Sequence, residues 1–382
     1  MKLPIYLDYA ATTPVDPQVA EQMMQYLTLE GHFGNPASLS HAFGKSARDA
    51  VEYARGQVAA ILNAEPTEII WTSGATEADN LALKGAAQLY QRKGKHIVTL
   101  KTEHKAVLDT CQELEKSGFQ VTYLTPDENG FLSPEKFQQA LREDTILVSI
   151  MQVNNETGVI QDVHALAKIT SARHILFHVD AAQSGAKMIL DVQKTPVDLV
   201  SLCAHKMYGP KGVGALYVRR KPRVRVAAQI HGGGQEHGMR SGTLATHQIV
   251  GMGKAAEVAL VCMQNDFEKL STQRQVFINI LSSENMRINA AVNTYPGILN
   301  ICFPGIPAET LIQACPDIAF SAGSACDTKG IEPSYVLRAM GLSAYDAACS
   351  VRFSFGRFTT LAEVTYAAEK IKRLLPVLKK PR

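Results

Sequence analysis

The sequence contains no long hydrophobic stretch and no strong excess of charge. No run of about 18 apolar residues occurs, which is the length that a membrane-spanning helix needs. The segment from Met1 to Tyr6 contains no apolar signal region. The 39 basic and 36 acidic residues leave a net charge of only +3, which gives no overall attraction to nucleic acid or membranes. We therefore expect a cytoplasmic protein that does not bind membranes.

Cysteines are few, and their spacing does not indicate a metal site. No two are spaced C-x-x-C, and none clusters with His at the spacing of zinc ligands, so we expect no metal. An odd, scattered set in a cytosolic chain is typical of free thiols. The seven are Cys111, Cys203, Cys262, Cys302, Cys315, Cys326 and Cys349.

Two common phosphate-binding motifs are also missing. The glycine-rich stretch 231–243 lacks the G-x-G-x-x-G spacing after a strand, which excludes a dinucleotide site of that type. The Gly44-Lys45-Ser46 triplet has Leu39 where a P-loop needs its first glycine, which excludes a P-loop.

The chain is long and apolar enough for a large core. Its 382 residues and 46% hydrophobic content suit two or three domains. Helical and strand patterns alternate, which predicts an α/β fold, and the strands are nearly continuous apolar runs, typical of a mostly parallel sheet covered on both faces. Strands are expected at 68–72, 96–100, 121–124, 146–151, 175–179, 199–203 and 215–218, and a helix at 75–91.

The pattern changes from about residue 263. A polar helix is predicted over 265–282, then an apolar strand over 297–303 and helices toward the C-terminus. We therefore predict a large domain over 16–262, and a smaller α+β domain formed by 1–15 and 263–382.

Lys206 and Asp180 each follow an apolar strand pattern. Lys206 comes after the run 197–203, and Asp180 directly follows 175–179. Pyridoxal phosphate (PLP) needs a Lys amine for its Schiff base and a carboxylate that keeps its pyridine nitrogen protonated. A structural ion pair would use the same two residue types, so this pair alone leaves both interpretations open.

Two further segments could contact such a cofactor. Ser73 to Asn80 joins a strand to a helix, where Gly74 and the free N–H groups of the first turn could hold a phosphate, with the Thr76 hydroxyl. An ordinary helix cap made by Ser73 or Thr76 is the alternative. His104 also follows a strand and could stack on a planar cofactor, or be purely structural. Ligands of open α/β sheets bind beyond the carboxyl ends of strands, where these residues could meet.

Cys326 differs from the other cysteines in its surroundings. It lies in a small, polar, glycine-containing stretch, 321–330, which predicts an exposed loop. Lys329 nearby would favour the thiolate. An incidental surface thiol is the alternative.

Together these features resemble the PLP-dependent cysteine desulfurases of the NifS/IscS type, which have the aspartate aminotransferase-like fold (fold type I). The resemblance extends from 6–14 to 352–360. Its most specific motifs are Thr102-Glu103-His104-Lys105-Ala106-Val107-Leu108, Val153-Asn154-Asn155-Glu156-Thr157-Gly158, His205-Lys206-Met207-Tyr208-Gly209-Pro210-Lys211-Gly212 and Arg240-Ser241-Gly242-Thr243.

The resemblance implies a set of site residues. Cofactor contacts would come from Gly74, Ala75, Thr76, His104, Asn155, Asp180, Gln183, Cys203, His205, Lys206 and, from the second subunit of a homodimer, Thr243. Asn155 and Arg352 would hold the substrate carboxylate, and Lys206, His104 and Cys326 would be catalytic. The implied reaction converts L-cysteine to L-alanine and leaves sulfur on Cys326 as a persulfide.

The acceptor of that sulfur is left open by the sequence. The resemblance allows an iron–sulfur scaffold or a tRNA- or DNA-thiolation protein, and basic runs at 219–225 and 370–382 could steer an acidic acceptor or be a solvated surface. Relatives usually continue beyond the position of Arg382 with a tail that docks the scaffold, so we expect weak transfer to that scaffold.

Two positions depart from the family pattern. Cys203 stands where Ser is common, and the loop after Cys326 is more charged than usual. The competing interpretations are another fold-type I enzyme, such as a selenocysteine lyase or aminotransferase, and a non-catalytic PLP-holding scaffold.

Overall fold

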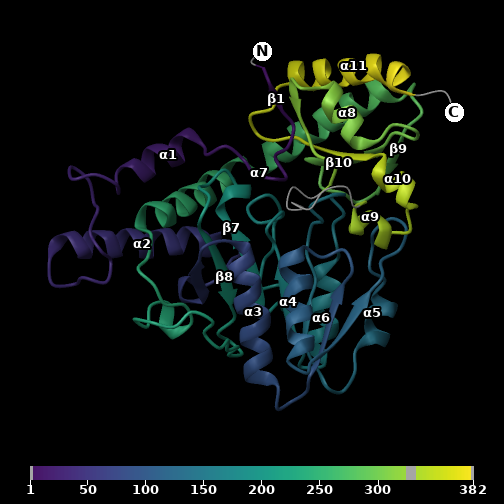
Figure 1. The fold of residues 1–382 in the computed structure, drawn as a ribbon. Helices are drawn as coiled ribbons and strands as arrows, with labels where there is room; N and C mark the ends of the chain where they lie inside the picture. The colour runs from purple at the N-terminus through teal and green to yellow at the C-terminus, as the bar shows by residue number, and fades with distance from the viewer. Residues whose placement is uncertain (1–2, 324–332, 380–382) are drawn as a thin grey trace.

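The structure is a computed structural model that describes residues 3–323 and 333–379 (Figure 1). A seven-stranded sheet forms the centre of its larger part, in the order β2-β8-β7-β6-β5-β3-β4. The strands are β2 (Ile69–Thr72), β3 (His96–Leu100), β4 (Gln120–Leu124), β5 (Thr145–Ser149), β6 (Leu176–Asp180), β7 (Leu199–Cys203) and β8 (Gly214–Val218). Only β8 is antiparallel to its neighbours. The predicted α/β class and mostly parallel sheet are therefore confirmed.

Helices follow most of these strands in the chain. The helices are α1 (Pro17–Met24), α2 (Ala42–Ala60), α3 (Ala75–Tyr90), α4 (Lys105–Lys116), α5 (Pro134–Ala140), α6 (Val163–Ala172), α7 (Thr246–Leu281), α8 (Ala308–Ala314), α9 (Tyr335–Ala339), α10 (Ala344–Ala348) and α11 (Leu361–Leu378). Short 3₁₀ turns occur at η1 (Pro66–Glu68), η2 (Ala204–Lys206) and η3 (Glu236–Gly238).

Both faces of the sheet are covered. Successive side chains of a strand point to opposite faces, so Ile70 of β2 packs in one apolar cluster with α3 and α4. Its neighbours Ile69 and Trp71 pack in the other cluster, with α2, α5, α6 and the first half of α7. Burial on both faces explains why the strands lack an alternating polar pattern.

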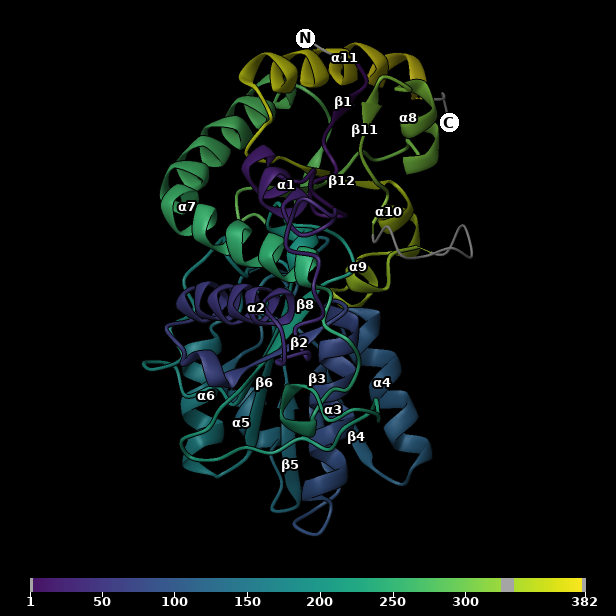
Figure 2. The same cartoon turned by 90° about the vertical axis from the view of Figure 1, so that its left-hand side faces the viewer.

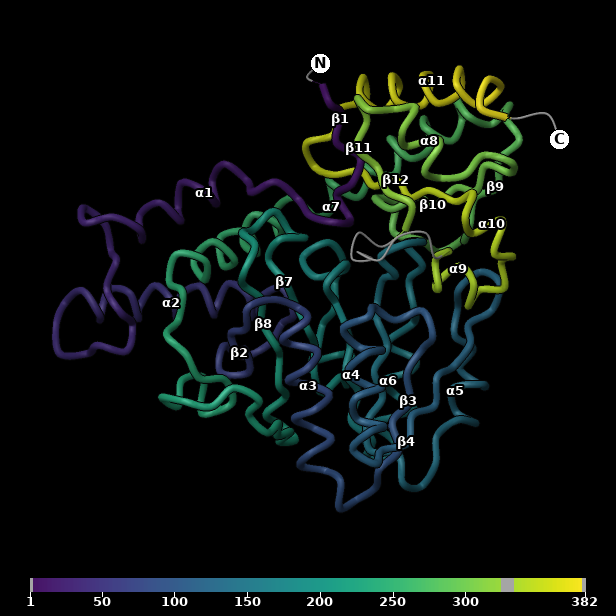
Figure 3. The backbone as a smooth tube through the Cα atoms, viewed as in Figure 1, coloured from purple at the N-terminus to yellow at the C-terminus, as the bar shows by residue number. Residues whose placement is uncertain are grey.

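A smaller part of the molecule is built from both chain ends. Strands β12 (Ser350–Ser354), β10 (Ile298–Cys302) and β9 (Arg287–Asn289) form an antiparallel sheet. The N-terminal strand β1 (Ile5–Tyr6) pairs in parallel with β11 (Ile318–Ala319), so the start of the chain lies among the C-terminal elements (Figure 3). A separate apolar core joins these strands to α8, α11 and the second half of α7.

Helix α7 packs against both parts of the molecule (Figure 2). Its 36 residues begin well before the predicted 265–282. Its first half includes Gly251 and Gly253, residues that weaken helices in isolation. A Cβ added at Gly251 would lie 2.7 Å from Met23 Cγ, and one at Gly253 would lie 2.7 Å from Ala54 Cα. The glycines therefore permit close packing against α1 and α2. The boundary predicted at residue 262 falls inside α7, and the two-domain division stays a prediction.

Neither a membrane-spanning helix nor a metal-binding cluster is present in the described ranges. No helix there is long and apolar enough to cross a membrane. No cluster of three or more His, Cys, Asp or Glu side chains in residues 3–323 and 333–379 is arranged to hold a metal ion.

Candidate active site

One cavity of about 450 Å³ lies at the carboxyl ends of the parallel strands. All the residues predicted to hold a cofactor line it, apart from Thr243: Gly74, Ala75, Thr76, His104, Asn155, Asp180, Gln183, Cys203, His205 and Lys206. This is where ligands of open α/β sheets bind. The structure therefore brings together residues that are up to 132 positions apart (Gly74 to Lys206) in the sequence.

The N-terminus of α3 forms one end of the cavity. Gly74 is its N-cap residue, with φ of 156°, a backbone angle that favours glycine. Within the described chain no side chain caps this first turn, so the alternative of an ordinary cap by Ser73 or Thr76 is wrong. The Ser73 N–H instead donates to the Glu77 carboxylate at 2.9 Å. An uncapped helix N-terminus with a neighbouring hydroxyl is suited to bind a phosphate.

Asp180 and Lys206 are close because their strands are neighbours. Asp180 ends β6 and pairs in register with Ser201 of β7, and η2, which contains Lys206, follows β7 directly. Asp180 is 5% exposed, and its Oδ1 accepts the Ala182 N–H at 2.8 Å. A fixed carboxylate and a Lys amine thus line the same cavity.

His104 is held in one tautomer. Its Nδ1 accepts the N–H of Ala106 at 3.1 Å and so caps α4. An accepting Nδ1 carries no proton, so the ring proton lies on Nε2. Burial lowers the pKa of His104; Asp180 raises this pKa and Lys206 lowers it. The imidazole is therefore neutral at pH 7.

Gln183 is oriented from two sides. Its Nε2 donates to the Ala10 carbonyl at 2.8 Å, and its Oε1 accepts from Lys187 Nζ at 3.4 Å. One N–H of the amide is left for a ligand. Burial, together with the nearby charge of Lys206, lowers the pKa of Lys187 to about 7. Sequence reasoning missed Lys187, although it lies four residues after Gln183.

Buried acidic groups lie behind the cavity. Burial raises the pKa of Asp79 well above its usual range, and repulsion from Asp180 adds to this. Burial likewise raises the pKa of Glu103, whose Oε1 accepts the Met151 N–H at 2.8 Å. His178, whose Nε2 is 3.5 Å from Asp79 Oδ1, has a pKa lowered to about 3 by burial. Asp79 and Glu103 therefore hold a proton more tightly than exposed carboxyl groups do, and His178 is neutral at pH 7.

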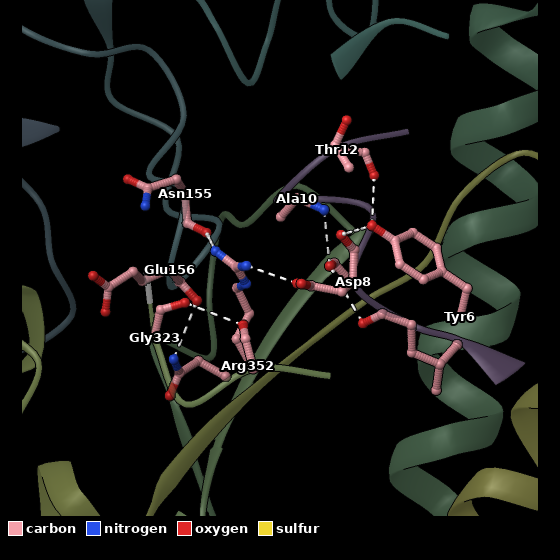
Figure 4. Close-up of polar contacts among 12 residues, drawn as sticks. Tyr6, Asp8, Ala10, Thr12, Asn155, Glu156, Gly323 and Arg352 are labelled. Carbon is pink, nitrogen blue, oxygen red and sulfur yellow. Dashed lines mark hydrogen bonds and ion pairs between the residues drawn. The ribbon is translucent and has the colours of Figure 1, made fainter. Parts of the chain in front are cut away.

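Arg352 lies beside the cavity rather than in its wall. It is 1% exposed, in the middle of β12, and its Nη1 donates to the Asn155 carbonyl at 2.8 Å (Figure 4). Its Nη2 contacts Asp8 Oδ1 at 2.8 Å. Arg352 Nε and Asn155 Oδ1 are buried without a hydrogen-bond partner in the described part of the chain. These two buried polar atoms therefore still have hydrogen bonds to offer to a polar ligand group.

Thr243 lies away from this cavity. It lines a second cavity of about 400 Å³, together with Arg48, Arg55 and Gln235. Its predicted contact with the cofactor would have to come from a second subunit, and that contact stays a prediction.

Cys326 lies outside the described residues, and its predicted role is not tested by the structure. The segments on either side of 324–332 are attached to the site. Ser321 and Arg352 exchange two backbone hydrogen bonds, of 2.7 and 3.2 Å. The Ser334 hydroxyl donates to the Glu156 carboxylate, and the Tyr335 hydroxyl donates to the Glu103 carbonyl at 2.7 Å. The six described cysteines are free thiols, as expected.

Comparison with known proteins places the chain in a family. The model of the aminotransferase class-V family matches residues 5–366. A relative from Colwellia psychrerythraea, described as cysteine desulfurase IscS, is 60% identical over 374 residues, which cover 97% of this chain and 93% of the relative. A solved structure of a NifS-like protein has a TM-score of 0.91 at 36% identity and covers 98% of this chain and 100% of its own. A structure of SspA in complex with cysteine has a TM-score of 0.84 at 38% identity, covering 93% and 100% of the two chains.

The chain therefore belongs to the aminotransferase class-V family. Its fold is the fold-type I arrangement of PLP-dependent transferases, as predicted, and PLP is the cofactor of the family. The residues present fit this cofactor. Lys206 offers the amine, Asp180 the carboxylate for the ring nitrogen, and the uncapped start of α3 a phosphate site, around one cavity of about 450 Å³.

Proposed function

We propose that this protein is a PLP-dependent cysteine desulfurase, which converts L-cysteine to L-alanine and passes the sulfur to a protein acceptor. One observation carries the proposal: Lys206, Asp180, His104 and the uncapped N-terminus of α3 share one cavity. The high identity to relatives described as cysteine desulfurases supports the substrate. Bound PLP supplies an electron sink for the charge that develops when the substrate Cα loses its proton.

The residues of the cavity have different roles in this proposal. Gly74, Ala75 and Thr76 would bind the phosphate, and Asp180 would hold the proton on the ring nitrogen. Lys206 would hold the cofactor through its amine, and the same amine, when free, would take the proton from the substrate Cα. Neutral His104 can accept or return a proton at its ring. Asn155 and Arg352 would hold the substrate carboxylate and so orient the substrate.

Sulfur transfer is assigned to Cys326. Its thiolate attacks the substrate sulfur, so an S–S bond forms while the C–S bond breaks. The electron pair of the C–S bond stays with the substrate carbon, which is later protonated to give alanine. No external oxidant is needed, because the persulfide sulfur is oxidised as the substrate carbon is reduced. A low thiol pKa would favour this step.

The proposal also covers the sulfur acceptor and the assembly of the protein. We infer a cytoplasmic homodimer in which Thr243 of each chain contributes to the other's site. Exposed Arg220, Lys221, Arg223 and Arg225 form a basic surface that would attract an acidic acceptor, an iron–sulfur scaffold or a thiolation protein. Arg219 does not belong to that surface, because its Nε donates to the Val197 carbonyl at 2.7 Å.

The proposal is tested with purified protein. We expect a yellow holoenzyme whose absorbance changes on adding L-cysteine, with alanine and sulfide formed in equal amounts under a small thiol reductant. Lys206→Ala should lose the Schiff base that borohydride traps. Cys326→Ser should still bind cysteine at the cofactor but form neither alanine nor persulfide.

The competing activities give different products. An aminotransferase would release a keto acid, and a selenocysteine lyase would act on selenocysteine without needing Cys326. A non-catalytic scaffold would bind PLP and release no product. Normal sulfide formation by Cys326→Ser would refute the assignment of Cys326.

A further inference from the structure

Arg352 already has an acidic partner within the protein. Its Nη2 is 2.8 Å from Asp8 Oδ1, and its Nη1 is 2.8 Å from the Asn155 carbonyl oxygen. Figure 4 shows the guanidinium between these two groups, with Asp8 on the side of the N-terminal segment. The Nε atom faces no hydrogen-bond partner among the described residues and is buried. In the part of the chain that the structure describes, one guanidinium nitrogen of Arg352 is therefore left to bind a ligand group.

Asp8 is held firmly where it meets Arg352. The Tyr6 hydroxyl donates to the carbonyls of Asp8, at 3.0 Å, and of Thr12, at 2.9 Å. The Ala10 N–H donates to Ser354 Oγ at 2.9 Å, and Asp8 forms a bridge with Ser354 of β12. Because Thr12 and the adjacent Ala11 line the cofactor cavity, the turn that fixes Asp8 is part of the cavity wall.

Asp8 occupies only part of the guanidinium of Arg352. Arg–carboxylate pairs are frequently two-bonded, whereas the structure gives this pair one contact, through Nη2. A carboxylate that binds at Nε would share the same guanidinium with Asp8. Two anions on one cation repel each other, and in a site with little water that repulsion is strong.

We propose that Asp8 is a specificity-determining residue for the substrate carboxylate: it positions Arg352 and partly neutralises it, and so limits how strongly the site prefers amino acids to amines. This inference rests on the proposed function, in which Arg352 binds the carboxylate of L-cysteine. Asp8 does not touch the reacting atoms and acts only through Arg352. With Asp8 charged, the site releases the carboxylate of the product alanine more readily.

The test compares two ligands that differ only in the carboxylate. L-cysteine and cysteamine are titrated into the holoenzyme in a Cys326→Ser background, where binding is followed by cofactor absorbance without turnover. Asp8→Asn keeps an oxygen for Arg352 Nη2 but removes the charge. It should lower the Kd of L-cysteine about fivefold and leave the Kd of cysteamine unchanged, since only the carboxylate senses the charge. Asp8→Glu, which keeps the charge, should retain the original ratio of the two Kd values.

Other outcomes would contradict either the inference about Asp8 or the proposed function. A purely structural pair predicts a lower thermal midpoint for Asp8→Asn with an unchanged cysteine-to-cysteamine ratio, and that result would overturn the inference about Asp8. Arg352→Gln is the control for the proposed function and should weaken cysteine but not cysteamine. If Arg352→Gln leaves the ratio unchanged, Arg352 does not bind the carboxylate, and the proposed function fails at that residue. If Asp8→Asn does not fold, Asp8→Glu still tests the proposal. A ratio of the two Kd values that shifts in favour of cysteamine in Asp8→Glu would contradict it.

Discussion

Arg55 and Glu236 form a two-bonded ion pair inside the protein, with Nη1–Oε2 and Nη2–Oε1 distances of 2.7 and 2.9 Å. Glu236 Oε2 also accepts the N–H of Trp71 in β2 at 2.8 Å, and Arg55 Nη1 donates to the Ile69 carbonyl at 2.7 Å. The glycine-rich segment 231–243 is thereby attached to the edge strand of the large sheet. Thr243, which we expect to reach the second subunit's cofactor, lies at the end of this segment.

Removing the charge of Glu236 should destabilise the protein strongly. In Glu236→Gln the buried Arg55 charge loses its buried partner and keeps only the partly exposed Glu52, which costs about 3–5 kcal/mol for buried pairs of this kind. We expect the urea midpoint to fall accordingly, followed by the fluorescence of the single tryptophan, Trp71. Glu52→Gln is the matched control, because Glu52 binds the same Arg55 but its side chain is 53% exposed, and it should change stability by less than about 1 kcal/mol. Equal effects of the two variants would contradict this account.

Cys203 should weaken cofactor binding relative to a serine. It lines the cavity and is 1% exposed, and its thiol lies 3.9 Å from the Ala182 carbonyl oxygen. Because a hydroxyl is a stronger donor than a thiol, Cys203→Ser should lower the Kd of PLP about two- to tenfold, which corresponds to about one hydrogen bond. Fluorescence titration of PLP-depleted protein measures the Kd of PLP in both proteins.

The control for Cys203 is a thiol of similar burial elsewhere. Cys111 is buried in α4, in the apolar cluster that also contains α3. Cys111→Ser places a hydroxyl in that cluster, so it should lower stability and leave the Kd of PLP unchanged. An unchanged Kd in Cys203→Ser would show that this position does not donate to the cofactor.

The parts of the site that follow a strand were predictable, and the parts formed by distant segments were not. Lys206, Asp180 and His104 each come just after an apolar run, so their meeting at one sheet edge follows from the parallel topology. Asp8 and Arg352 are separated by 344 residues, and neither end of the sequence carries a pattern that pairs them. The N-terminal motif 6–14 was recognised by resemblance, but its role in the cavity wall became visible only in the fold.

Helix α7 shows that local sequence patterns also predict the fold incompletely. Gly251 and Gly253 weaken a helical pattern in sequence, where nothing indicates that α1 and α2 pack closely against them. Tertiary packing overrides the local preference there. The polar second half, without glycine, was predicted correctly because its own pattern is sufficient.

His178 should make stability fall as the pH is lowered. Burial holds its pKa at about 3, against 6.5 for an exposed histidine, so between these values the unfolded chain binds a proton that the folded protein does not. This contribution is complete above pH 6.5 and is lost as the pH falls toward 3. Between pH 7 and pH 5 the loss is about 2 kcal/mol. In His178→Gln the free energy of unfolding should therefore decrease less over this range.

The control variant for His178 is chosen from the groups that surround its ring. Its ring nitrogens contact the hydroxyls of Ser149, at 2.8 Å, and Ser201, at 2.9 Å, and Asp79 is the acidic group beside it. Asp79 has a raised pKa, so its own effect has the opposite sign, and it is present in both proteins. Ser149→Ala removes a hydrogen bond but no titrating group, and should lower stability equally at both pH values. Urea unfolding at pH 7 and pH 5 makes the comparison.

Sulfur transfer to an acidic acceptor should depend on the basic surface formed by Arg220, Lys221, Arg223 and Arg225, defined by their exposure. Exposed charges steer association, and salt screens them over about 10 Å at 0.1 M. Replacing Arg220, Arg223 and Arg225 by Glu should slow transfer to the acceptor about tenfold or more at low salt, because charge steering changes on-rates by that order. Alanine formation with a small thiol reductant should stay unchanged, since none of these side chains lines the cofactor cavity.

The second basic run provides the control for this surface. Lys370 of α11 is paired with Asp317, while Lys372 and Arg373 carry the remaining positive charge of that helix. Replacing Lys372 and Arg373 by Glu lowers the net charge by 4, against 6 for the three arginines, and does so at another place. If this pair slows transfer as much as the Arg220 group does, only overall charge matters and the acceptor has no defined docking surface. Transfer that is insensitive to salt in the unmodified protein would refute steering by either run.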